Sequence, residues 1–236
     1  MTWRLLFDKA NQAKDCLDIN SVKQNDVVVL IGRPSAEFVA WMFGVWLIGA
    51  VLVPMDSSMP SGRRNQLLEQ LPAHFCLLRL SEKNPHPQWT TGLEKSLSIP
   101  DNLCAVIFTS GSSGLPKPVM LAWQGVNSYV ASLISQFGLK SSDVFLHQMT
   151  PGFDGHIAEV LIALKLRSSM AIVHGDTWSA SACRETIEQS LVTAAVGGGF
   201  VPILLEKVLQ LGRLPLCLRK VQVGGDRVTS ELIEPL

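Results

Sequence analysis

An unbroken run of apolar residues from Val27 to Ile31 (VVVLI) constrains the fold of this chain more than any other feature. The run lacks the apolar–polar alternation of a half-exposed strand, so it predicts a strand covered on both faces. A helix is expected from about Ser35 to Ile48, because Ser35 is a suitable N-cap and Glu37 lies in the first turn. Buried strands separated by helices are typical of parallel, doubly wound sheets. The sequence therefore predicts an α/β fold.

The same alternation continues to the end of the chain. Further strands are expected at 51–53, about 75–80, 103–108, 144–146, 170–173, 191–195 and 218–223. Further helices are expected at about 61–71, 123–137, 154–165, 181–189 and 200–211. The polar, proline-broken stretch 81–100 is expected to be a connecting loop. We therefore expect two subdomains, at about 1–100 and about 101–236.

Composition excludes several functional classes. The 236 residues include 20 basic and 20 acidic side chains, so no net charge favours nucleic acid or an anionic membrane. The five cysteines show no metal-ligand spacing, which is typical of reduced thiols in a cytoplasmic protein. The uncharged stretch 38–53 falls short of the roughly 20 residues that span a membrane, and Gly44 and Gly49 interrupt it. We interpret it as a buried helix followed by a strand.

The segment after the strand at 103–108 suits phosphate binding. It runs FTSGSSGLPKP over residues 108–118. Gly111 and Gly114 allow backbone N–H groups to approach an anion, and Lys117 adds a positive charge for phosphate oxygens. The candidate hydroxyl donors are Thr109, Ser110, Ser112 and Ser113. A flexible Gly/Ser linker is a poor alternative, because a buried strand precedes the segment and Pro-Lys-Pro closes it.

This loop differs from a Walker-type phosphate loop, in which a Lys and a hydroxyl residue open a helix. Here Lys117 follows Pro116, and Pro118 takes the place of the hydroxyl residue. The segment closely resembles the [ST]-S-G-[ST]-[ST]-G-x-P-K-G motif of the adenylate-forming enzymes. That family includes the adenylation domains of nonribosomal peptide synthetases, acyl-CoA synthetases and luciferases. Pro118 is the one clear departure, because the family has glycine there.

Three further segments carry the same resemblance. Residues 49–56 (GAVLVPMD) are similar to the family's G-A-x-Y-V-P-L-D element. Residues 153–159 (FDGHIAE) are similar to its F-D-x-S-v-x-E element, with His156 in place of Ser. Gly224-Gly225-Asp226 stands where the family has Gly-Gly-Glu at a strand end. We expect His156 to face solvent, and the glycines at 197–199 to form a turn into the next helix.

The resemblance also implies a substrate. In members that activate amino acids, the residue that matches Asp154 pairs with the α-ammonium group of the substrate. From the residues alone, a structural N-cap aspartate is the favoured alternative. The same matching assigns the side-chain pocket to Gly155, Ala158, Val196, Val221 and Val223. These small and aliphatic residues indicate an apolar pocket, although Val221 and Val223 also fit an ordinary strand core.

The resemblance implies attack of a substrate carboxylate on the α-phosphate of ATP complexed with Mg²⁺. The acyl group of the resulting adenylate then passes to the phosphopantetheine thiol of a carrier protein. Lys117 is the expected catalytic residue and holds the β- and γ-phosphates with the loop hydroxyls, while Gly224, Gly225 and Asp226 face the adenine. We expect no metal ligand in this chain, because nothing matches the Tyr-Gly-Pro-Thr-Glu element whose Glu binds Mg²⁺.

We therefore expect roughly the first half of an adenylation domain, truncated at both ends, that does not complete the reaction alone. Two alternatives stay open. A fragment of a carboxylate–CoA ligase would favour acids without an amino group. A non-catalytic nucleotide-binding remnant is the other.

Overall fold

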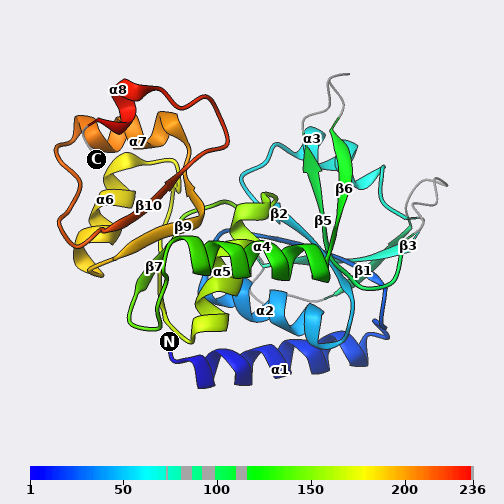
Figure 1. The fold of residues 1–236 in the computed structure, drawn as a ribbon. Coiled ribbons are helices and arrows are strands. Elements are labelled where there is room, and N and C mark those ends of the chain that lie inside the picture. The colour runs from blue at the N-terminus through cyan, green and yellow to red at the C-terminus, as the bar shows by residue number, and fades with distance from the viewer. Residues whose placement is uncertain (73, 81–86, 92–98, 110–115, 235–236) are drawn as a thin grey trace. The chain divides into compact units, whose positions relative to one another are not determined.

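The computed structural model describes residues 1–72, 74–80, 87–91, 99–109 and 116–234. Contacts divide the chain into two compact units, Met1–Val126 and Asn127–Leu236. Each unit contains one sheet with helices packed against it (Figure 1). Each also has a hydrophobic core of its own.

The first unit is organised around a six-stranded sheet in the order β4-β3-β1-β2-β5-β6. Its strands are β1 (Val27–Gly32), β2 (Val51–Asp56), β3 (His74–Arg79), β4 (Gln88–Thr91), β5 (Leu103–Thr109) and β6 (Lys117–Ala122). The four central strands run parallel, whereas β4 and β6 pair antiparallel with their neighbours at the two edges. All six residues of β1 are buried, as the apolar run predicted.

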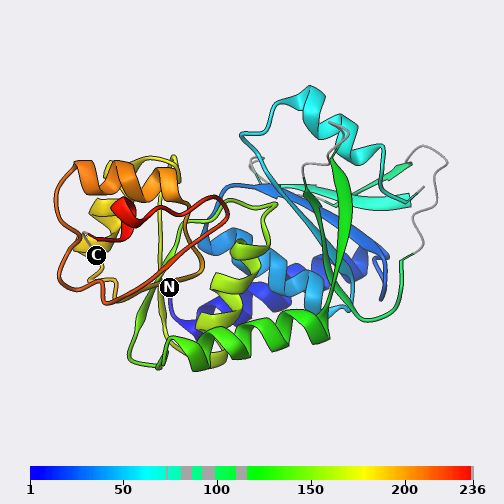
Figure 2. The ribbon, with the colours of Figure 1, turned by 45° about the horizontal axis from the view of Figure 1, so that its top comes forward.

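Helices cover both faces of this sheet. They are α1 (Trp3–Ile19), α2 (Ala36–Leu47) and α3 (Ser61–Leu68). Figures 1 and 2 show α1 and α2 on one face and α3 on the other. The Ser35 hydroxyl accepts the N–H of Phe38 at 3.0 Å, which confirms the expected cap of α2. Gly44 lets α1 and α2 approach closely, since a Cβ there would lie 2.7 Å from the Cβ of Ala13.

The second unit has a parallel four-stranded sheet in the order β10-β9-β7-β8. Its strands are β7 (Val144–His147), β8 (Ser169–Ile172), β9 (Ala194–Phe200) and β10 (Lys220–Val223). Its helices are α5 (Asp154–Leu166), α6 (Ala180–Gln189), α7 (Pro202–Gln210) and α8 (Ser230–Ile233), and α4 (Trp123–Gln136) leads into the unit. Figure 1 shows α5 on one face of the sheet and α6 with α7 on the other. This arrangement confirms the doubly wound α/β class.

Asp143 ties the amino ends of three strands together. Its buried carboxylate forms an ion pair with Lys220 at 2.6 Å and accepts the hydroxyl of Thr193 at 2.9 Å. The connection at the opposite end of β7, residues 148–153, leads into α5. Parallel sheets bind ligands beyond the carboxyl ends of their strands, so this second end positions a candidate site.

Three expectations about local structure were wrong, and one strand was missed. The stretch 81–100 contains the short strand β4, and the missed strand, β6, follows the phosphate-loop segment. The glycines at 197–199 belong to β9, which continues to Phe200. The β5–β6 hairpin pairs with the first sheet, whereas the sequence placed it in the second subdomain. Edge strands and glycine-rich strands have weak local patterns, since their pairing depends on distant partners.

Candidate functional site

The two ends of the predicted phosphate loop meet in a β-hairpin. Thr109 ends β5, Lys117 begins β6, and the two residues are partners in the antiparallel ladder. Both side chains are exposed, so one hydroxyl and one ammonium group are available beside the loop. The other predicted phosphate-binding residues, Ser110, Gly111, Ser112, Ser113 and Gly114, lie outside the described residues.

Pro118 lies in β6 opposite Phe108. Proline lacks a backbone N–H and is tolerated in sheets mainly on edge strands. Because β6 is the edge of the first sheet, the departure from the family's glycine fits the local structure.

The Gly224-Gly225-Asp226 segment forms a turn directly after β10. The N–H of Gly224 donates to the carbonyl of Phe200 at 3.1 Å, and Gly225 has φ +83°, a conformation that favours glycine. A Cβ on Gly224 would meet no described atom within 4 Å, so this backbone faces open space. The exposed Asp226 accepts the N–H of Arg227 at 2.7 Å. The turn to which the sequence assigned adenine binding is therefore open at Gly224.

Asp226 also lines a groove between α7 and the segment that follows β10. The groove has a volume of about 630 Å³, within the range of small-molecule sites. Its lining residues are Pro202, Ile203, Glu206, Leu209, Gln210, Asp226, Arg227, Thr229, Glu231 and Leu232. Sequence reasoning did not find this groove, because it forms only when α7 and residues 226–232, which β10 separates in the chain, pack side by side.

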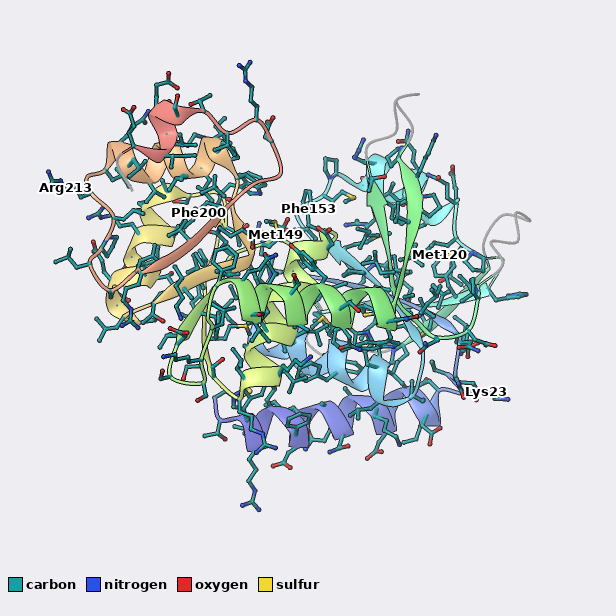
Figure 3. The ribbon with its side chains drawn as sticks, in the orientation of Figure 1. Lys23, Met120, Met149, Phe153, Phe200 and Arg213 are labelled. Atoms are coloured by element: carbon teal, nitrogen blue, oxygen red, sulfur yellow. The ribbon has the colours of Figure 1, made fainter. Side chains whose placement is uncertain are left out.

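Asp154 is the first residue of α5 and is exposed. Its Oδ1 accepts the N–H of Gly155 at 2.9 Å, within the first turn of the helix. The N-cap position belongs to Phe153, which makes no side-chain cap and is 51% exposed. Figure 3 labels Phe153 near this end of α5. The carboxylate of Asp154 is therefore accessible to a ligand.

The predicted pocket residues occupy two different environments. Gly155, Ala158 and Val196 are buried where α5 packs against β9, and a Cβ on Gly155 would lie 2.5 Å from the Cα of Gly198. Val221 and Val223 are half-buried on β10, opposite Ala195 and Phe200 of β9 respectively. The structure thus groups the first three tightly and places the other two on the neighbouring strand.

Comparison with known proteins decides the family. The whole chain, residues 1–236, matches the family of AMP-binding enzymes. This chain belongs to that family. One of the plipastatin synthase subunits of Bacillus subtilis (strain 168) is 28% identical to it over 256 residues, which covers 99% of this chain.

Solved structures show the same fold. A nonribosomal peptide synthetase, FmoA3, superposes with a TM-score of 0.78 and 22% identity over 98% of this chain. The O-succinylbenzoate coenzyme A synthetase of Bacillus subtilis, solved with AMP, superposes with a TM-score of 0.78 and 18% identity over 98% of this chain. The chain spans 7% of the plipastatin synthase protein, 26% of the FmoA3 chain and 62% of the coenzyme A synthetase.

In this member of the AMP-binding family, a buried polar cluster lies behind the connection between β7 and α5. Nδ1 of His147 and Oε2 of Glu159 lie 2.8 Å apart, and both side chains are buried. Glu159 Oε2 also accepts the N–H of Met149 at 3.2 Å, and Nδ1 of His156 donates to the carbonyl of Met149 at 2.9 Å. The prediction that His156 faces solvent was wrong, because its exposed fraction is 0%.

Burial controls the ionisation of this cluster. It lowers the pKa of His147 to about 3, so the imidazole is neutral near neutral pH. Burial also raises the pKa of the Glu159 carboxyl well above its ordinary value. Hydrogen bonds from the backbone of Met149, Gln148 and Gly198 lower this pKa, but the effect of burial is larger. The spacing of His156 and Glu159, three residues apart on one helix, is the sequence signal that could have placed both on the buried face.

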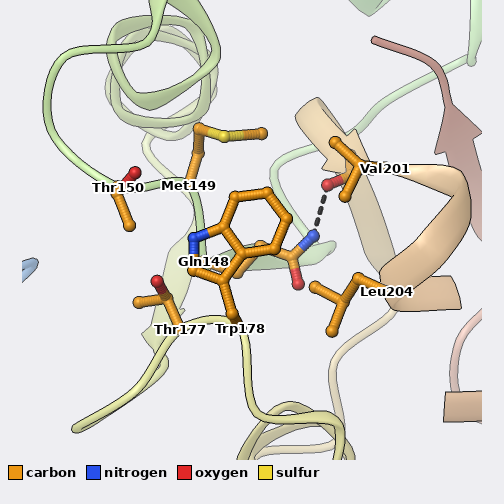
Figure 4. A pocket seen from close by; sticks show the side chains of 8 residues that line it. Gln148, Met149, Thr150, Thr177, Trp178, Val201 and Leu204 are labelled. Atoms are coloured by element: carbon orange, nitrogen blue, oxygen red, sulfur yellow. Dashed lines mark hydrogen bonds between the residues drawn. The ribbon is translucent and has the colours of Figure 1, made fainter. Parts of the chain in front are cut away.

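A small pocket lies at the carboxyl ends of β7 and β9 (Figure 4). Its volume is about 10 Å³, room for about one water molecule. Gln148 forms one wall; its amide donates to the carbonyl of Gly199, and its oxygen accepts the thiol of Cys183 at 3.0 Å. The indole of Trp178 lies across the pocket, with Met149 and Leu204 beside it. Burial raises the pKa of Cys183 to about 12, so this thiol is a structural donor.

Neither a metal-binding cluster nor a membrane span occurs among the described residues. They contain no group of three or more His, Cys, Asp or Glu side chains that could hold a metal ion. The described helices include none that is both long and apolar enough to cross a membrane.

Proposed function

We propose that this chain is the nucleotide- and substrate-binding part of an adenylation domain. The domain activates the carboxylate of an amino acid with ATP and passes the aminoacyl group to the phosphopantetheine thiol of a carrier protein. The observation that carries the proposal is the exposed carboxylate of Asp154 at the start of α5, beyond the carboxyl end of β7. The relatives with synthase and peptide synthetase names support the same assignment.

The donor groups of the hairpin suit a polyphosphate. Lys117 brings a positive charge and Thr109 a hydroxyl to one exposed end of the β5–β6 ladder. Charge-assisted bonds to phosphate oxygens are stronger than neutral ones, and they neutralise charge as pyrophosphate leaves. The open backbone at Gly224 supports the assignment of the adenine ring to this turn.

The carboxylate of Asp154 suits an α-ammonium group. An ion pair there holds the amino acid by its amino group and leaves its carboxylate available to attack the α-phosphate of ATP. The residues around the proposed pocket (Gly155, Ala158, Val196, Val221 and Val223) bring no charge, so a substrate with an uncharged side chain is favoured. The described residues provide no cluster of ligands for Mg²⁺.

Calorimetric titration with a non-hydrolysable ATP analogue tests the nucleotide part. We expect Lys117→Ala to weaken binding roughly tenfold to a hundredfold, since a hydrogen bond to a charged group contributes about 1.5–3 kcal/mol. Lys23→Ala is the matched control, because Lys23 is also an exposed lysine of the first unit. Equal affinity of all three proteins would remove Lys117 from the site.

A second titration tests the substrate class. It compares glycine, alanine, leucine and phenylalanine with acetate, propanoate, 4-methylpentanoate and 3-phenylpropanoate, the same acids without the amino group. We expect Asp154→Asn to remove the preference for the amino acids, whereas the exposed control Asp8→Asn keeps it. A native chain that prefers acids without an amino group would instead support a carboxylate–CoA ligase, the alternative favoured by the coenzyme A synthetase neighbour.

A further inference from the structure

The connection between β7 and α5 is held by side chains of α5 itself. His156 and Glu159 lie three residues apart on this helix, and both contact the backbone of Met149. Glu159 accepts the N–H of Met149 at 3.2 Å, while His156 donates to its carbonyl at 2.9 Å. Both polar groups of this residue are therefore tied to the helix that Asp154 begins.

His147 secures the carboxyl group in turn. It comes from the last position of β7, and its Nδ1 lies 2.8 Å from Oε2 of Glu159. The buried Nε2 of His147 has no hydrogen-bond partner in the described part of the chain. We assign the imidazole proton to Nδ1, because a buried N–H without an acceptor costs more than a bare nitrogen. In this tautomer Glu159 Oε2 accepts from both His147 and Met149.

Close backbone packing fixes the same turn from another side. A Cβ on Gly155 would lie 2.5 Å from the Cα of Gly198 in β9, and a Cβ on Gly198 would lie 2.5 Å from Oε1 of Glu159. The first turn of α5 therefore has little room to move toward β9. The exposed Asp154 lies immediately before this contact.

We propose that His147, His156 and Glu159 form a positioning cluster that sets the location of the Asp154 carboxylate. The role assigned to Asp154 rests on the proposed function, whereas the effect of the cluster on residues 149–155 does not. Apolar side chains of similar volume often stabilise a core at least as well as buried ionisable groups. Here one imidazole and a carboxyl bind the backbone of Met149, and a second imidazole binds the carboxyl, so the cluster fixes a geometry.

Three substitutions separate positioning from general stability. His156→Leu removes the donor to Met149 and retains an apolar side chain of moderate size. His156→Asn restores a donor close to the position of Nδ1, so it is the conservative rescue. His174→Leu makes the same chemical change at an exposed histidine of the same unit and serves as the control.

The first measurement is the affinity for the four amino acids and the four matched acids named above. We expect His156→Leu to weaken binding of the amino acids about tenfold or more and to leave the matched acids unchanged, because a displaced contact group loses its ion pair. His156→Asn and His174→Leu keep the native preference. An equal loss for both sets of acids would contradict positioning and indicate a general structural effect.

The second measurement is amide hydrogen exchange over residues 149–155 in the folded proteins. We expect exchange there to rise at least tenfold in His156→Leu and to return toward the native rate in His156→Asn, with β10 as the internal reference. If the native chain binds none of the acids, the proposed function fails, and this measurement still decides about the cluster. Unchanged exchange in His156→Leu would overturn the positioning proposal.

Discussion

The β5–β6 hairpin and the β7–α5 connection are both candidate ligand-binding segments that follow a buried strand, yet they are held in different ways. At the hairpin, Thr109 and Lys117 are exposed and are paired through the backbone ladder. At the connection, buried side chains of α5 bind the backbone N–H and carbonyl of Met149. The candidate binding groups of the hairpin are exposed, whereas the groups that hold the connection in place are buried.

This difference predicts which substitutions affect binding and which affect stability. An exposed group contributes little to folding and can be changed with effects confined to the ligand. A buried polar group leaves its partners unsatisfied when it is removed, and the fold then loses stability. Three comparisons, each between a buried residue at the β7–α5 connection and an exposed residue elsewhere, test this distinction.

The largest expected effect is that of Glu159→Ala. Removing this carboxyl leaves His147 and the N–H of Met149 buried without their acceptor. We expect the free energy of unfolding, measured by urea denaturation, to fall by about 2–6 kcal/mol, because each buried donor left without an acceptor costs about 1–3 kcal/mol. Lys117→Ala is the hairpin counterpart and should change it by less than about 0.5 kcal/mol. Similar losses in both variants would contradict the distinction.

Two helical glycines provide the next comparison. A Cβ on Gly155 in α5 would lie 2.5 Å from the Cα of Gly198, whereas a Cβ on Gly125 in α4, the helix after β6, would meet no described atom within 4 Å. Gly155→Ala should lower the free energy of unfolding by about 1–3 kcal/mol through overpacking. Gly125→Ala should raise it by up to about 1 kcal/mol, because alanine favours helix more than glycine does. Thermal unfolding of both variants provides the measurement.

The last comparison concerns a pH dependence. Burial lowers the pKa of His147 from 6.5 to about 3. Between these two pH values the unfolded chain binds a proton at His147 that the folded chain does not bind. Stability from this residue is therefore complete above pH 6.5 and decreases as the pH falls, by at most about 1.4 kcal/mol per pH unit. His147→Asn should reduce that slope, whereas the exposed His74→Asn should not.

The raised pKa of Glu159 acts in the opposite direction, with stability decreasing as the pH rises through that pKa. Both His147→Asn and the native chain keep Glu159, so the difference between their slopes isolates the histidine. Urea denaturation at several pH values between about 4 and 7 measures it. Equal slopes would show that the pKa of His147 does not differ between the folded and the unfolded chain.

The sequence predicted most elements of the fold because their signals are local. The apolar run in β1, the Ser35 cap of α2 and the alternation of strands with helices all lie within single segments, and the structure confirms them. The strands that were missed or misplaced, β4, β6 and the glycine-rich β9, form through pairing with strands elsewhere in the chain. Their register depends on partners that a local pattern does not contain.

The candidate site divides in the same way. The sequence by itself determined the family resemblance and the polar groups of the phosphate-loop motif, since adjacent residues encode both. Only the tertiary structure decided that His156 is buried, that His147 contacts Glu159, and that Gly155 packs against Gly198. Each of these contacts joins a helix to a strand or its exit, and its energy depends on exclusion of water from both partners. That exclusion arises only when the sheet and α5 pack together.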